Sequence, residues 1–508
     1  MKVTKSMIVF FAAFAMTVTT LSSCSDDNGS GETKPTDPDV SYVGGVAQSS
    51  GILFKEGKQI GNGDKEFVFT GKQTIKKGTY LLKGFVYVAK GAELTVEAGT
   101  IIKGDKETKG TLIIEPGGKA FMAGTANAPI VMTSEKLPGQ RRPGDWGGLI
   151  VCGNARNNQG TQQIEGGPRT IHGGDNDNDN SGIFQYIRVE FAGNPFAVDK
   201  EINGVTFGSV GKNTTVDHIQ VSYSNDDSFE WFGGSVNCKY LVAYKGWDDD
   251  FDTDNGFSGH VQFGLAVRDP RIADTSQSNG FESDNCADGA TVSPYTNAVF
   301  SNITFIGPKT AKNSDFINKS SYITGGDMYP DNGSKLGLFQ SAMQIRRSSR
   351  LSCYNSVAVG FPVGLIIDGE KGSTVDYAKG GLFHLKNIIF AGMDAVGSDN
   401  NKKYEDQYYD KATGSYDATR KSYSNTFFFS EGNRTMNESD LNLVDGAINT
   451  VGQNYLPSAG SPLLSGASFA GVTSSFLNTT VSYLGAFSGV NDNWLNSWTN
   501  FDPQNTVY

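Results

Sequence analysis

Cysteine and histidine are scarce in this sequence, and their scarcity argues against several kinds of site. The 508 residues include only five cysteines and four histidines. Beyond Cys24 the cysteines are widely spaced, with no Cys-x-x-Cys pair, which argues against a structural zinc site. We expect them to be small buried residues, with a disulfide as the alternative in an oxidising compartment. These cysteines are Cys152, Cys238, Cys286 and Cys353.

Positive charge is also in deficit. Lysine and arginine number 43 against 54 aspartates and glutamates, for a formal net charge of −11. No stretch of the chain forms a basic stripe that could follow a phosphate backbone, so we expect no nucleic-acid partner.

Long helical patterns are hard to find, whereas glycine is abundant, with 63 residues. From Tyr80 onward, short β-branched or aromatic runs such as "FVYV", "LTV" and "TII" alternate with glycine-containing turns. Strands this short suit neither a sandwich nor a barrel. They are typical of a solenoid, in which each coil stacks on the last and buries what it cannot bury alone.

The N-terminus resembles a bacterial lipoprotein signal. Lys2 and Lys5 precede the apolar run "MIVFFAAFAMTVTT", and "LSSC" ends at Cys24. The run is short for a membrane span across a hydrocarbon core of about 30 Å. The resemblance implies removal of residues 1–23 and acylation of Cys24, which would anchor the protein to the outer membrane.

Residues 24–42 are rich in Gly, Pro, Ser and Asp, and this composition predicts a flexible tether. The acidic pair in "SDD", directly after Cys24, resembles the surface-export signal of Bacteroidota lipoproteins. The resemblance implies a protein that faces the outside of the cell.

Three segments carry a resemblance to a fold. The runs "GAELTVEAGTIIKG", "GDWGGLIVCGNA" and "SAGSPLLSGA" resemble parts of right-handed parallel β-helix surface proteins of the Bacteroidota, which have a pectin-lyase-like solenoid. We therefore expect an all-β chain, with a right-handed parallel β-helix over 43–395 and loop insertions. Residues 396–508 are expected to hold a polar insertion and C-terminal coils or a cap. The fold alone names no activity, because it hosts lyases, hydrolases, adhesins and binding proteins.

Three phenylalanine–acid pairs recur in the middle of the chain. If Phe229, Phe251 and Phe281 align inside successive coils, the acids that follow them form an outward row about 4.8 Å apart. The acids of this row are Glu230, Asp252 and Glu282, with Asp254 and Asp284 two residues further on and on the same face.

Such a row of carboxylates needs compensation, because like charges repel strongly at this spacing. Calcium is one candidate, since it takes six to eight oxygen ligands in irregular geometry. The alternatives are pairing with basic residues of neighbouring coils, or direct use of the acids in catalysis. The basic candidates are Lys239, Lys245, Arg268, Arg346 and Arg347.

A second acidic segment lies in "GGDNDNDNSG", where Asp175, Asp177 and Asp179 alternate. Alternate carboxylates resemble the start of a calcium loop. The segment departs from the EF-hand pattern, because Asn180 replaces the glycine of the sharp turn and Tyr186 the bidentate glutamate. It is therefore either a calcium loop or a solvated turn.

Aromatic and polar residues near the row are candidates for ligand contact. Trp231 and Trp247 could form a stacking platform for sugar rings, although large aromatics also fill coils. Asp226 and Asp227 lie at the start of the same acidic segment. Arg268 and Arg346 could contact an acidic ligand or, with Lys245, remove a proton from a uronate.

The motifs of pectin-degrading hydrolases are not matched in order or content. "DTDN" at 252–255 and "NDD" at 225–227 occur in the wrong order, and no "RIK" follows. We therefore favour a surface lipoprotein that binds a nutrient glycan or peptide, or that assists an outer-membrane importer of the starch-utilisation type. A calcium-assisted polysaccharide lyase or hydrolase is the second interpretation, and a structural or adhesive protein is the third.

Overall fold

The computed structural model describes residues 40–50, 54–55, 58–63, 65–197, 200–401, 403–444, 456–492 and 494–508. The chain divides into Met1–Pro38 and Asp39–Tyr508, and all described residues belong to the second unit. The predicted signal and Cys24 therefore lie outside the described residues. No helix within the described part has the length and apolar character needed to cross a membrane.

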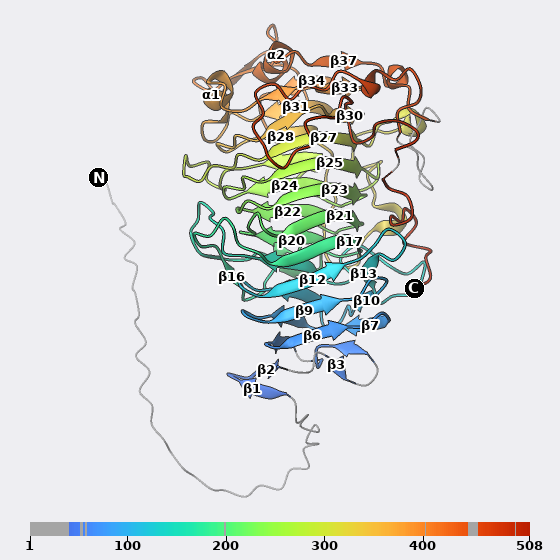
Figure 1. Cartoon of the computed structure of the whole chain (residues 1–508). Coiled ribbons are helices and arrows are strands. Elements are labelled where there is room, and N and C mark those ends of the chain that lie inside the picture. The colour runs from blue at the N-terminus through green and yellow to red at the C-terminus, as the bar shows by residue number, and fades with distance from the viewer. Residues whose placement is uncertain are drawn as a thin grey trace, which may run out of the picture. The chain divides into compact units, whose positions relative to one another are not determined.

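The described residues form a right-handed parallel β-helix, as predicted (Figure 1). One sheet, here called sheet A, contributes one strand per coil. Its strands are β1 (Ser41–Val43), β2 (Val46–Ser49), β5 (Glu66–Phe69), β8 (Phe85–Val88), β11 (Thr111–Ile114), β14 (Gly148–Cys152), β20 (Val205–Gly208), β22 (Phe229–Phe232), β24 (Phe251–Asp254), β26 (Phe281–Ser283), β28 (Ser341–Ile345), β31 (Val363–Ile367) and β34 (Ala395–Ser398).

The other long sheet, sheet B, closes the coils. Its first coils carry two short strands each, which merge into one long bent strand in the middle coils and separate again near the end. Its strands are β3 (Phe54–Lys55), β4 (Gln59–Ile60), β6 (Lys72–Ile75), β7 (Thr79–Leu82), β9 (Glu93–Val96), β10 (Ile101–Gly104), β12 (Lys119–Ala123), β13 (Ile130–Ser134), β17 (Gly182–Glu190), β21 (Thr215–Ser222), β23 (Asn237–Tyr244), β25 (His260–Val267), β27 (Val299–Ile306), β29 (Ser352–Tyr354), β30 (Val357–Val359), β32 (Leu385–Lys386), β33 (Ile389–Ala391) and β37 (Arg434–Met436).

Short elements decorate the coils. Three hairpins project from them: β15 (Gln162–Gln163) with β16 (Ile171–His172), β18 (Pro195–Ala197) with β19 (Lys200–Glu201), and β35 (Tyr408–Asp410) with β36 (Ser415–Asp417). The helices α1 (Thr374–Lys379) and α2 (Tyr423–Ser430) lie at the end of the stack formed by the last coils (Figure 1). Four 3-10 turns are described: Ala311–Asn313, Gly326–Met328, Glu438–Leu441 and Pro462–Leu464.

The interior of the coils is apolar and rich in stacked aromatics. Phe229, Phe251 and Phe281 face each other in consecutive strands of sheet A and have no exposed surface. The Phe229 and Phe251 rings stack with centroids 5.8 Å apart. The predicted phenylalanine alignment is confirmed, because residues of equal parity in a strand point to one side.

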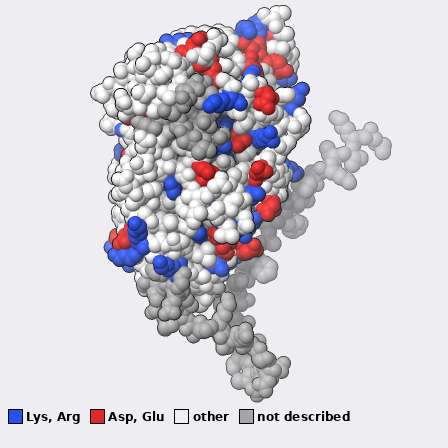
Figure 2. Space-filling view, turned by 90° about the vertical axis from the view of Figure 1, so that its right-hand side faces the viewer, with Lys and Arg blue, Asp and Glu red and all other residues white. Residues whose placement is uncertain are grey.

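The C-terminal part differs from the expectation of further coils. Parallel strands continue beyond residue 395 as far as β37, and residues 456–508, here called the strap, run back over the outer surface of sheet B (Figure 1). The strap buries Leu484, Phe487 and Trp498 against this sheet in a second hydrophobic cluster. It contains only two charged residues, Asp492 and Asp502. On the face seen in Figure 2, where the strap lies, charged side chains are scattered around a wide uncharged area.

The four described cysteines are buried and free. Burial raises the pKa of Cys152, Cys238 and Cys353 above that of an ordinary thiol. These thiols stay protonated and fill space in the stack, as expected for small buried residues.

Candidate functional site

The predicted row of acids exists on the outer surface of sheet A. Glu230 in β22 lies opposite Asp252 in β24, and Asp252 lies opposite Glu282 in β26. We call Glu230, Asp252 and Glu282 the acidic ladder. Asp254 ends β24 and Asp284 directly follows β26, each two residues beyond its ladder acid, so the alignment made from the sequence is correct for Glu230, Asp252 and Glu282.

Further carboxylates join the ladder from the turns that precede the strands. Among the described residues, three overlapping sets of carboxylates each bring one oxygen per residue within 4.8 Å of the others. The sets are Asp226–Asp227–Asp248, Asp227–Glu230–Asp252 and Asp249–Asp252–Glu282. Together they form one continuous cluster, here called the acidic face.

Burial and mutual repulsion hold protons on the acidic face. Burial, with Asp226 adding to it, raises the pKa of Asp227, and burial together with Glu282 raises that of Asp252. Burial raises the pKa of Asp254 to about 8. Burial, partly offset by Arg346, raises the pKa of Glu282 to about 7. These carboxyls therefore keep their protons to a higher pH than ordinary aspartates and glutamates do.

Some of the turn acids also have a structural role. The Asp227 carboxylate accepts a hydrogen bond from the backbone N–H of Asp249, 2.8 Å away, and the Asp249 carboxylate accepts one from the N–H of Asn279. Asn279 continues the series by accepting from the N–H of Ser341. Each side chain thus caps the strand of the next coil. Some of the repeated acids are therefore explained by these turn hydrogen bonds, which join one coil to the next.

Among the described residues, the arginines that form ion pairs with the outward acids lie at the Glu282 end of the acidic ladder. Arg346, which follows β28, bonds to Glu282 and also to Asp284, with an N–O distance of 2.9 Å in the second pair. Arg347 bonds to Asp284 at 2.7 Å. The ion-pairing interpretation thus holds for these two acids.

The other end has no described arginine or lysine in ion-pair contact with the ladder. Asn203 donates its amide N–H to Glu230 instead. Three buried oxygens in this region lack a hydrogen-bond partner: Asp248 Oδ1, Asp252 Oδ1 and Asn203 Oδ1. Asn203 is 1% exposed, so its free oxygen is a fixed acceptor beside the ladder. Buried acceptors without donors are costly, and hard oxygens in this number are the ligands that calcium prefers.

The tryptophans do not form the stacking platform that the sequence suggested. Trp231 has no exposed surface and stacks inside the coils on Phe207 and Phe257, with centroids 5.7 and 5.3 Å away. Its parity is that of Phe229, so the pleat turns it inward. Trp247 is also fully buried, in the turn before β24. Neither ring is accessible to a ligand.

Arg268 and Lys245 are likewise unavailable to a ligand. Arg268 is 3% exposed and pairs with the fully buried Asp250 at 3.0 Å. Lys245 follows β23 in sheet B and pairs with Asp269 at 3.4 Å. Burial alone would lower the pKa of Lys245, but Asp269 and two tyrosine hydroxyls raise it above its ordinary value. A lysine with a raised pKa is a poor general base.

The loop at 175–179 does not gather its carboxylates. Asp177 pairs with Arg156, and Asp179 accepts a hydrogen bond from the backbone N–H of Asn154 at 3.1 Å. Asp175 points to solvent, and none of the three belongs to a carboxylate set found within the described residues. The loop is thus a solvated turn, because its acids are used separately.

Sequence reasoning missed Asp248, Asp249 and Asn203. The run "DDD" before Phe251 contained the first two, but no periodicity marks a turn residue as a site residue. Asn203 comes from a different coil, and only the stacking of β20 on β22 brings it to Glu230.

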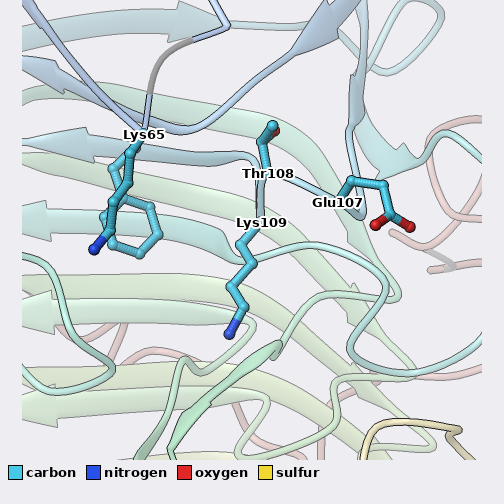
Figure 3. A pocket seen from close by; sticks show the side chains of 5 residues that line it. Lys65, Glu107, Thr108 and Lys109 are labelled. Carbon is cyan, nitrogen blue, oxygen red and sulfur yellow. The ribbon is translucent and has the colours of Figure 1, made fainter.

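A separate pocket of about 440 Å³ lies beside the early coils, lined by Phe85 of β8 and by Lys65, Glu107, Thr108 and Lys109. Figure 3 shows the Lys65 and Lys109 side chains extending in a similar direction, while Glu107 points away from them. Lys109 donates a hydrogen bond to the carbonyl of Pro195 at 2.7 Å. This pocket is lined by two lysines and one glutamate, whereas the acidic face is formed by carboxylates.

Comparison with known proteins identifies the family of the chain. A family model described as a pectate-lyase-like β-helix domain matches residues 68–434. None of the curated proteins compared with the chain matches it. Among solved structures, the chain is similar to the crystal structure of Dettilon tailspike protein (gp208), with 11% identity, a TM-score of 0.23 and coverage of 65% of this chain. The match spans 60% of the tailspike chain.

Proposed function

Because the chain belongs to the family of pectate-lyase-like β-helix domains, we propose that it is a binding protein whose acidic face holds calcium ions and, through them, an acidic glycan. The observation that carries this proposal is the set of overlapping carboxylate groups with buried oxygens that have no donor. Calcium would use Asp227, Glu230 and Asp252 as ligands, with Asp226 and Asp248 at one end and Asp249 and Glu282 at the other.

A glycan with carboxylate groups fits such a site, because calcium takes six to eight oxygen ligands and each set supplies three carboxylates, so further oxygens could complete its coordination. The bare acidic face would repel an anionic chain, and bound calcium would reverse that charge. Binding of the glycan would therefore depend on calcium. Peptide ligands would need donors and apolar pockets that the acidic face does not offer.

In this proposal the N-terminal signal and the acylated Cys24 hold the protein at the outer membrane, facing outward, and residues 24–42 act as the tether. A lipid-anchored glycan binder would serve an outer-membrane importer as an accessory subunit. The residues behind this part of the proposal are those of the lipoprotein signal in the sequence.

One observation favours a second candidate, a polysaccharide lyase or hydrolase on the same face. The pKa values of Glu282 and Asp254 are raised to about 7 and about 8, which is the range that a general acid needs near neutral pH. Arg346 lies against Glu282 and could contact a uronate. A structural or adhesive protein would need neither calcium nor these shifted carboxyls.

Calcium titration by isothermal calorimetry tests the binding proposal. We expect saturable heat for the purified chain and at least a tenfold loss of affinity in the double variant Glu230→Gln, Asp252→Asn. The matched control, Glu107→Gln with Asp175→Asn, removes the same charge from two exposed acids outside the acidic face. Equal affinity in all three proteins would refute the calcium site.

A panel of acidic and neutral polysaccharides then separates the functions. The chain is incubated with each one in calcium, and both retention and new reducing or unsaturated ends are followed. Calcium-dependent retention without new ends supports binding. New ends that disappear with chelator and in Glu282→Gln establish the enzyme instead.

A further inference from the structure

The turn that precedes β24 supplies two carboxylates to the acidic face. Asp248 belongs to one of the three carboxylate sets, and Asp249 belongs to another. Like charges this close together repel one another, and neither residue lies in a strand whose ladder would fix its position. Other contacts must therefore hold the turn beside the acidic ladder before any cation binds.

Arg268 binds the backbone of this turn. It directly follows β25 and donates hydrogen bonds to the carbonyls of Trp247 and Asp248. It also donates to Asp250 Oδ1, 3.0 Å away. One guanidinium thus contacts three of the four residues at 247–250. An arginine suits this task, because its donors are fixed in one plane and can reach several acceptors at once.

The ion pair of Arg268 with Asp250 is shielded from water. Both side chains are fully buried, and the Arg268 guanidinium lies 5.4 Å from the centroid of the Phe339 ring. Phe339 belongs to the segment between β27 and β28, where Asn318 holds its backbone through two hydrogen bonds of 2.9 and 3.0 Å. A guanidinium enclosed in this way has few other positions to adopt.

Stability alone does not account for this buried pair. Among the described residues, Asp250 Oδ2 and Arg268 Nε have no hydrogen-bond partner. A buried ion pair that is incompletely satisfied adds little stability, and uncharged residues of similar size are often as stable or more so. An uncharged aliphatic side chain at position 268 would not donate to the carbonyls of the turn, however.

We propose that Arg268 is a positioning residue for the calcium site: together with Asp250, it fixes the turn so that the carboxylates of Asp248 and Asp249 meet those of the neighbouring coils. Arg268 itself would contact neither the ion nor a ligand. This inference rests on the proposed function. It predicts that calcium affinity depends on a buried cation, although a cation by itself repels calcium.

Variants of the pair separate positioning from stability. Arg268→Met with Asp250→Asn removes both charges together, and with them the donors to the two carbonyls. Arg268→Lys keeps a charge beside Asp250 but lacks the planar fork that reaches both carbonyls. The matched control is Arg188→Met with Glu190→Gln, a largely buried pair on sheet B, 3.4 Å apart and in contact with the strap.

Calcium affinity is measured by isothermal calorimetry on the purified chain, and the melting temperature is measured in chelator. We expect the double variant and Arg268→Lys to melt close to the unaltered chain and to lose at least about tenfold in calcium affinity, because the ligands are no longer held in place. The control pair should leave calcium affinity unchanged.

Terbium in place of calcium gives a second measurement. Its luminescence lifetimes in H2O and D2O report how many water molecules the bound ion keeps. We expect more bound water in both Arg268 variants, because a carboxylate of the turn no longer reaches the ion, and no change in the control. A general loss of stability would not alter the hydration of the ions that remain bound.

Four results contradict the inference. Unchanged calcium affinity and terbium hydration in the double variant overturn it and leave the proposed function standing. Full calcium affinity in Arg268→Lys overturns it as well, because charge alone would then be sufficient, and this variant decides the question if the double variant does not fold. An equal loss of affinity in the control pair would assign the effect to stability. Absence of calcium binding in the unaltered chain would refute the proposed function together with this inference.

Discussion

On the outer surface of β25, the Gln262 amide exchanges two hydrogen bonds with the backbone of Asn478 in the strap, at 3.1 and 2.7 Å. On β24, which precedes β25 in the chain, Asp252 Oδ1 faces outward without a hydrogen-bond partner. On sheet B the strap bonds to outward amides, whereas on sheet A the described basic residues pair with the acidic ladder at the Glu282 end. Two strands that follow one another in the chain thus differ, because the strap covers β25 while β24 carries the proposed binding site.

The strap shows how the covered face is held. Besides Gln262, Gln220 bonds in both directions to Asn500, and Asn355 does so to Ser468. Each amide imitates a backbone donor–acceptor pair, so no sheet ladder is needed along the strap. No matching segment pairs with the acidic ladder among the described residues, and Asp252 Oδ1 has no hydrogen-bond partner there.

The largest expected effect is the loss of packing under the strap. Trp498 has no exposed surface and packs edge-on against Tyr186 and His218. Trp498→Ala should lower the free energy of unfolding by about 3–5 kcal/mol, because it leaves a cavity in a closed cluster. Urea denaturation measures this, and calcium affinity should stay unchanged.

The control for that variant is Phe429→Ala, since Phe429 of α2 is 47% exposed. We expect Phe429→Ala to lower the free energy of unfolding by well under half as much as Trp498→Ala does. Equal losses would mean that the strap adds little to the stability of the covered face.

A smaller effect is expected from Arg346→Gln. This change leaves Glu282 without its arginine, while Asp284 keeps Arg347, and should cost about 2–3 kcal/mol in chelator, because Glu282 and Arg346 are largely buried. Calcium should restore most of this loss, since it can bind the Glu282 carboxylate in place of the arginine. Urea denaturation with and without calcium is the measurement.

Lys309→Gln is the matched control, because its pair with Asp394 is solvent-exposed and should contribute at most about 1 kcal/mol. If calcium leaves the Arg346→Gln loss unchanged, the acidic face does not bind the ion at that end.

The pH dependence of stability should separate the two faces further. In the folded chain the pKa values of Glu282 and Asp254 are about 7 and about 8, above those of unfolded carboxyls. The folded state therefore holds more protons between about pH 4 and 8, and its stability falls as pH rises through this window.

In chelator, we expect the melting temperature to drop by several degrees between pH 5 and pH 8. Calcium should flatten the slope, because it binds the ionised form. The double variant Glu282→Gln, Asp254→Asn should flatten it without calcium. A slope that neither treatment alters would place its origin outside the acidic face.

The smallest effect is expected at the solvated turn. Asp175→Asn should change neither the calcium affinity nor the free energy of unfolding by more than about 0.5 kcal/mol, since Asp175 is exposed and apart from the carboxylate sets. A clear loss of calcium binding would return this loop to the list of metal sites.

Local periodicity explains which predictions were correct. The strand register that aligns Glu230, Asp252 and Glu282 follows from the repeated phenylalanine–acid pair, since a period of two residues sets the face of every side chain. The same rule turns Trp231 inward, one residue after Glu230, so its burial could have been predicted. Trp247 precedes its strand, where the rule does not apply.

The sequence by itself determined the β-helix, the phenylalanine stack and the outward row of acids, because each depends on residues close together and repeated from coil to coil. Only the tertiary structure decided which acids are paired and where the strap lies. Glu282 meets an arginine 64 positions away, and Gln262 meets the strap 216 positions away. Contacts between residues so far apart in the sequence depend on how coils stack and on where the loops lead the chain. Short-range periodicity carries no information about either.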